Sequence, residues 1–266
     1  MLTEVKNSLN FIFKSIVCNI KSALEYKKSF ITQTVFMIVN NGFFLIFWLV
    51  VFAINNGNIS GIEMKDILYL WSIPTISWGI AHFFFGGVFE FNRYIINGEL
   101  DTYLLQPKNM FFNIATSKCD VAAFGDIIYG LVIAIIVSEN LLHFFMIMMF
   151  AIIATVLTIC VSIIIRSLAV WFGDVDNVAH VYEQSLFITF CTYPDVVFSS
   201  GIKFLMYTII PAMYAVHLPI KLLGKFDIKI FMLIIIAMMI FIGISKALFG
   251  AVLKRYESGN NIALKL

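Results

Sequence analysis

Charged residues are scarce in this sequence: Asp, Glu, Lys and Arg make up 13% of its 266 residues, against about 25% in typical soluble domains. The formal net charge is only +2 and basic residues cluster at most in pairs, which argues against a nucleic-acid-binding protein. The four cysteines are scattered and none forms a CxxC pair. We therefore expect neither a disulfide framework nor a zinc site.

Motifs of enzymatic chemistry are also missing. The chain has no HExxH and no GxSxG motif. Ser185 or Ser199 can be combined with His217, but nothing in their spacing singles them out as a catalytic pair. His180 and Glu183 form a single pair, in the reverse order of the Glu-x-x-His motif, so no metal site is expected. An intramembrane enzyme is the weakest alternative for this chain.

Hydrophobic residues, by contrast, make up 61% of the chain, and 28 of them are Phe. A helix needs about 20 apolar residues to cross a bilayer. We predict an all-α integral membrane protein with six spans, at 30–53, 67–88, 121–137, 141–165, 178–198 and 230–253. The abundance of Lys, Ile and Asn is typical of AT-rich bacterial genomes and points to a bacterial cytoplasmic membrane.

The region before the last predicted span is broken by proline. Pro194 interrupts the fifth span, and Pro211 and Pro219 interrupt residues 202–223, for which we predict a re-entrant segment. Six spans place both termini on the side richer in Lys and Arg, which the positive-inside rule makes cytoplasmic. A seventh crossing through 202–223 would move Lys254 and Arg255 outside, and they argue against it.

Residues 1–28 show the pattern of an amphipathic interfacial helix. Leu9, Ile12, Ile16 and Ile20 recur at helical spacing, with Lys residues largely off that face. Two roles remain open for this helix, a simple membrane anchor and a contact with a partner protein.

The stretch "EFNRYIINGELDTYLLQPKN" mixes apolar and charged residues too finely to enter lipid. Gly98 predicts a turn between two short helices. Leu100, Tyr103 and Leu104 would form one apolar face, and Pro107 would stop the second helix. A short amphipathic element of this kind on a cytoplasmic loop is suited to the groove of a soluble partner.

Two motifs resemble the six-span permeases of ATP-binding-cassette (ABC) exporters, the type-2 ABC permease family. The first is similar to the family pattern Gly-x-Leu-Asp-x-Tyr-Leu-Leu-x-Pro and is carried by Gly98, Leu100, Asp101, Tyr103, Leu104, Leu105 and Pro107. The second is a Tyr-Pro followed by a broken segment, carried by Tyr193, Pro194, Gly201, Pro211 and Pro219. The resemblance covers nearly the whole chain.

This resemblance implies an exporter of the type V fold. Two permeases, identical or paralogous, would pair in the lipid bilayer, and a separate ABC ATPase carrying ATP and Mg would dock beneath each. Residues 89–108 would be the coupling helix, where Glu90, Arg93, Glu99 and Asp101 would contact the ATPase. The alternative is that these charges belong to a solvated loop, where exposed ion pairs contribute about 0–1 kcal/mol. The chain has no GxxxxGK[ST] phosphate loop, so another chain would bind the ATP.

Polar residues inside the spans are the remaining candidates. Asp126 interrupts the third span and either serves the translocation path or faces interfacial water. Asn40 and Asn41 either line that path or hold helices together by hydrogen bonds. The acidic residues Asp174, Asp176 and Glu183 depart from the more neutral segment expected at the start of the fifth span.

A transporter that works without an ATPase is the main alternative to the exporter. Such proteins usually show inverted repeats and intramembrane ion ligands. The two halves of this chain show no obvious self-similarity, and Asp126 has no clear counterpart in the second half. The substrate stays open, because drugs, peptides, lipids and glycans are all handled by permeases of this shape.

Overall fold

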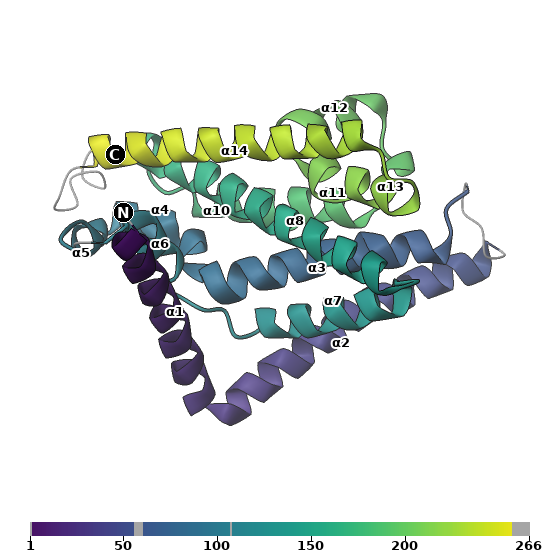
Figure 1. The fold of residues 1–266 in the computed structure, drawn as a ribbon, viewed down its shortest axis with the longest axis horizontal. Coiled ribbons are helices and arrows are strands. Elements are labelled where there is room, and N and C mark those ends of the chain that lie inside the picture. Colours follow the sequence, from purple (N-terminus) through teal and green to yellow (C-terminus); the bar gives the residue numbers. More distant parts are fainter. Residues whose placement is uncertain (1, 56–60, 107, 257–266) are drawn as a thin grey trace.

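The computed structural model describes residues 2–55, 61–106 and 108–256, and the regular elements in these ranges are helices (Figure 1). Four helical stretches among them are long and apolar enough to cross a membrane: Lys27–Ile54, Met64–Ile96, Leu141–Phe172 and Ile228–Arg255. They contain α2 (Lys27–Ile54), α3 (Met64–Phe85), α8 (Leu141–Ser167) and α14 (Ile228–Arg255). They cover the first, second, fourth and sixth predicted spans.

The third and fifth predicted spans are shorter in the structure. The helix α7 (Ala123–Val137) has 15 residues, about 22 Å at the rise of an α-helix, against about 30 Å of bilayer hydrocarbon. The fifth consists of α10 (Asp176–His180), a π-helical segment (Val181–Phe187) and α11 (Ile188–Thr192). The prediction that this span runs to residue 198 is wrong. Pro194 forces Tyr193 into an extended conformation, with φ −100° and ψ 144°, and the helix ends there.

The proline-containing region after α11 is a bent pair of helices. The helix α12 (Ser200–Thr208) is followed by a π-helical segment (Met213–His217) and α13 (Leu218–Gly224), and the two halves are bent by 84°. Pro211 lies in the break between them. If this pair counts as one span, the described residues contain five candidate spans rather than the predicted six.

Glycines allow the helices around α3 to pack closely. A Cβ added to Gly79 of α3 would lie 2.9 Å from the Ala123 carbonyl oxygen, and one added to Gly130 of α7 would lie 3.0 Å from the Ile76 nitrogen. Small residues are the usual means by which membrane helices approach each other. The helix α3 therefore lies at the centre of the bundle, with α7 and α8 packed against it.

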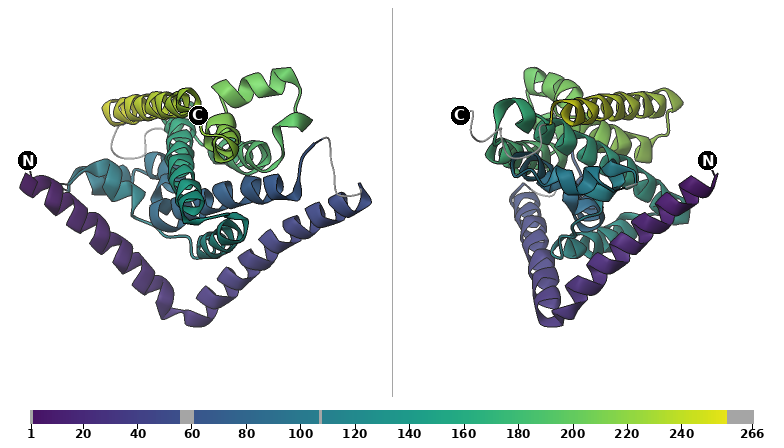
Figure 2. Two further views of the ribbon diagram at one scale, coloured as in Figure 1. Left: turned by 45° about the vertical axis from the view of Figure 1, so that its right-hand side comes forward. Right: turned by 90° about the vertical axis from the view of Figure 1, so that its left-hand side faces the viewer.

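The two ends of the bundle differ. In Figure 1 the short helices α4 (Phe91–Ile96), α5 (Leu100–Leu104) and α6 (Met110–Ala115) gather at the end of the bundle where α14 ends. The segments α12 and α13 lie at the opposite end. Figure 2 shows α1 (Leu2–Glu25) and α2 as two arms of a V, with α1 outside the bundle.

The helix α1 is held to the rest of the protein at its middle. Ser15 Oγ and Asn19 Nδ2 both donate hydrogen bonds to the Thr116 carbonyl oxygen, at 2.8 and 2.9 Å. The Lys108 ammonium lies 3.6 Å from the centre of the Phe11 ring. These contacts tie α1 to the loop that carries α6, whereas the ring of Phe13 is exposed.

Candidate functional site

The predicted turn at Gly98 is present between α4 and α5. Gly98 has a φ of 73°, a conformation that side chains with a Cβ rarely adopt. The turn directs α5 back toward α4, and the Tyr94 and Tyr103 rings lie 5.4 Å apart. Pro107, the predicted stop of α5, lies outside the described residues.

The structure corrects the apolar face that was predicted for α5. Leu100 is 0% exposed and packs in a cluster with Phe91, Ile95 and Val252. It therefore supports the segment from behind, and a charge at this position would disturb the core as well as any docking. Leu104 at the end of α5 and Leu105 directly after it, at 49% and 86% exposed, are the large apolar residues that this segment presents outward.

The charged residues of this segment differ in how far they are already engaged. Glu90 forms ion pairs with Arg93, at 2.8 Å, and with Lys118, at 3.1 Å. Glu99 accepts a hydrogen bond from Asn97 Nδ2 at 3.0 Å. Partial burial raises the pKa of the phenol of Tyr256, and the nearby carboxylate of Asp101 acts in the same direction. Each of these three carboxylates thus has an interaction within this chain.

A buried ion network lies directly beneath α4. The Arg166 guanidinium, at the end of α8, donates to Asn92 Oδ1 at 2.8 Å, to Asp176 Oδ1 at 3.0 Å and to Glu183 Oε2 at 2.8 Å. Arg166 is 4% exposed and Glu183 is 3% exposed. Asp174 Oδ1 in turn accepts a hydrogen bond from the Asp176 backbone N–H.

This network explains the acidic residues that looked out of place in the sequence. Asp176 and Glu183 neutralise Arg166, the residue that directly follows the fourth predicted span. An arginine directly after a long apolar run, followed by carboxylates 10 and 17 residues further along the chain, is the signal that would have indicated such a pairing. Glu183 is engaged here and does not pair with His180.

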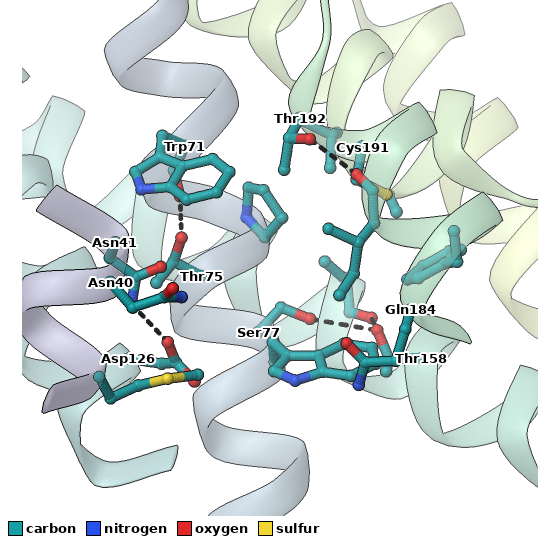
Figure 3. Close-up of a pocket in the computed structure, with 18 residues that line it drawn as sticks. Asn40, Asn41, Trp71, Thr75, Ser77, Asp126, Thr158, Gln184, Cys191 and Thr192 are labelled. Carbon is teal, nitrogen blue, oxygen red and sulfur yellow. Dashed lines mark hydrogen bonds between the residues drawn. The ribbon is translucent and has the colours of Figure 1, made fainter. Parts of the chain in front are cut away.

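A cavity of about 270 Å³ lies deeper in the bundle (Figure 3). Its wall is built from α2, α3, α7, α8, α11 and both π-helical segments. Asp126 lies beside Asn40 and Asn41 on one side, and Gln184 and Thr158 lie on the other. Asn40 and Gln184 are themselves exposed, so amide groups stand at the open edge of the cavity.

The structure brings together the polar residues predicted in the first and third spans. Asn41 Nδ2 donates to Asp126 Oδ1 at 2.6 Å, across 85 residues of sequence. Asp126 is 3% exposed within the described chain, so it does not face open interfacial water. Gly125 permits this contact, because a Cβ there would lie 2.6 Å from the Thr34 carbonyl oxygen on α2.

The residues of the Tyr-Pro motif lie in different surroundings around the bent region. The Tyr193 ring packs at 90° on Phe44, with ring centres 5.8 Å apart. Pro194 and Pro219 are buried, and Gly201 is exposed with open space around it. Tyr182 OH donates to the Ile209 carbonyl at 2.7 Å, beside the break at Pro211. The irregular backbone beside Pro211 thereby gains a hydrogen-bond donor.

Comparison with known proteins identifies a family for this chain. A family model described as "ABC-2 family transporter protein" matches residues 38–260, which include the ion network, the segment around Gly98, the bent region and the cavity wall except for Met37. No curated protein and no solved structure matches the chain. The chain belongs to the ABC-2 transporter family, as a multi-pass membrane component of such a transporter.

Proposed function

We propose that this chain is the permease subunit of an ABC exporter, and that a separate ATPase chain drives outward transport through it. The observation that carries the proposal is the exposed pair Leu104 and Leu105, where a short helix ends at one end of the bundle. Leu100 holds that helix against the core. An apolar surface on a rigid support is what docking to a soluble partner requires.

The six-span topology with cytoplasmic termini belongs to the same proposal. It takes α7 and the α10–α11 segment as short spans, and the bent pair α12–α13 as a re-entrant segment. The end of α14 packs against α4 and α5, and the middle of α1 is hydrogen-bonded to Thr116 directly after α6, so this end would be the cytoplasmic one. The helices α2 and α14 are the least buried of the four long stretches. Lipid and a second permease would cover them.

The ion network offers a route by which movement at the docking helix would reach the cavity. Asn92 of α4 bonds to Arg166, and Arg166 bonds to Glu183 in the first π-helical segment. Gln184 and Phe187 of that segment line the cavity. A push on α4 and α5 by the ATPase would therefore be passed through one guanidinium to the cavity wall.

The test is the double variant Leu104→Asp/Leu105→Asp, expressed in the native host with an affinity tag. We expect it to lose the co-purifying ATPase, because charge replaces the exposed apolar surface, while its amount in the membrane stays normal. Val196→Asp is the matched control, since Val196 is 53% exposed and lies outside this segment. An undiminished ATPase with the double variant would refute the docking surface. Absence of any ATPase with the unaltered chain, even after crosslinking, would refute the exporter itself.

A further inference from the structure

The charge of the cavity wall is unbalanced. Asp126 is the carboxylate among the lining residues, and none of them is Lys, Arg or His. Its Oδ1 accepts the bond from Asn41, whereas its Oδ2 is buried without a hydrogen-bond partner among the described residues. Burying a carboxylate without a compensating cation or donor is costly. The cavity therefore lacks a positively charged group.

Three threonine hydroxyls of the wall donate their protons to backbone carbonyls of their own helices. Thr75 donates to the Trp71 carbonyl at 2.5 Å, Thr158 to the Ala154 carbonyl at 2.9 Å, and Thr192 to the Ile188 carbonyl at 2.9 Å. A hydroxyl has one proton to donate, so Thr75 and Thr192 have only lone pairs left, whereas Thr158 also contacts Ser77 Oγ at 3.3 Å, where either hydroxyl can donate. A ligand that binds against Thr75 or Thr192 must supply the N–H or O–H groups.

The rest of the wall is aromatic and aliphatic. Trp71 and Trp78 both line the cavity, and indole is the side chain that attracts cations most strongly through its ring. Met37, Phe187 and Val216 complete an apolar surface. Such a wall accepts a small hydrophobic body attached to the charged group.

We propose that this cavity binds a small organic ammonium ion, with its N–H groups directed to Asp126 Oδ2 and its apolar body against the indoles. An ammonium ion supplies positive charge and several donors at once, which meets both demands of the wall. As an assignment of substrate class, the inference rests on the proposed exporter function. As a binding site, it stands on the geometry of the cavity alone.

The experiment uses the purified full-length chain, with any ATPase that accompanies it, in lipid nanodiscs. Benzylamine, which is positively charged at pH 7.5, is compared with benzyl alcohol, which is neutral and nearly the same shape. Binding is followed by isothermal titration and by the fluorescence of the indoles. We expect benzylamine to bind and benzyl alcohol to bind at least about tenfold more weakly, the factor that corresponds to one charge-assisted hydrogen bond.

The matched variants are Asp126→Asn and Asp120→Asn. The first removes the charge with little change in size and should weaken benzylamine binding about 10- to 100-fold. The second makes the same change at an exposed carboxylate outside the cavity and should leave binding unchanged. Equal binding of both ligands by the unaltered chain, or no benzylamine binding at about 10 mM, would overturn the proposal without needing either variant.

The same preparation separates this proposal from the exporter function. Leu104→Asp/Leu105→Asp should bind benzylamine normally, because these residues lie outside the cavity wall. Normal benzylamine binding by a chain that has no ATPase partner would leave the site intact and refute the exporter. Loss of the ATPase from the double variant, with no benzylamine binding by the unaltered chain, would support the exporter and refute the ammonium site.

Discussion

Two buried charges, Arg166 and Asp126, are treated in opposite ways by this fold. Arg166 has two carboxylates and an amide oxygen within 3.0 Å. Asp126 has one amide donor at 2.6 Å and no cation among the residues that the structure describes around its cavity. A charge that is neutralised inside the chain holds helices together. A charge left without a counter-ion beside a cavity is available to a ligand.

The largest expected effect is on the neutralised charge. Arg166→Met would leave Glu183 buried without a cation, which costs about 3–5 kcal/mol when one partner of a buried pair is removed. Lys118→Met is the control, because its ion pair with Glu90 is partly exposed and is worth about 0–1 kcal/mol. Thermal unfolding in detergent measures both. Similar melting temperatures for the two variants would mean that the Arg166 network does not stabilise the fold.

A smaller effect is expected where α2 approaches α7. Gly125→Ala would place a Cβ 2.6 Å from the Thr34 carbonyl oxygen and push α2 away, at a cost of about 1–3 kcal/mol. It would also lengthen the contact between Asn41 and Asp126. Gly243→Ala, which meets nothing within 4 Å, is the matched control on α14. Cysteine crosslinking between α2 and α7 reports the separation, and unchanged crosslinking would contradict the close packing inferred here.

The smallest effect on stability is expected at the charge without a counter-ion. Asp126→Asn keeps a hydrogen-bond acceptor for Asn41 and removes an uncompensated buried charge, so the free energy of unfolding should stay the same or rise. The measurement is the melting temperature of Asp126→Asn, compared with that of Arg166→Met. A loss of stability as large as that of Arg166→Met would show that Asp126 is a structural residue like Arg166.

Much of the fold was predictable because it depends on local chemistry. The four long helices follow from the length of the apolar runs. The turn at Gly98 follows from the backbone freedom of glycine, and the break at Pro211 from the missing N–H of proline. The predicted end of the fifth span failed although Pro194 was noted. Pro194 holds Tyr193 in an extended conformation, and this ended the helix at Thr192. The predicted span had included the apolar residues after Pro194 as well.

The sequence by itself determined that this is a helical membrane protein of the ABC-2 transporter family, because apolar runs and the motif around Gly98 are properties of neighbouring residues. Only the tertiary structure decided which charges meet. Asn41 and Asp126 are 85 residues apart, and Arg166 and Asn92 are 74 apart, so no local pattern predicts either contact. The inward position of Leu100 was decided in the same way, by the packing of α5 against α4 and the end of α14.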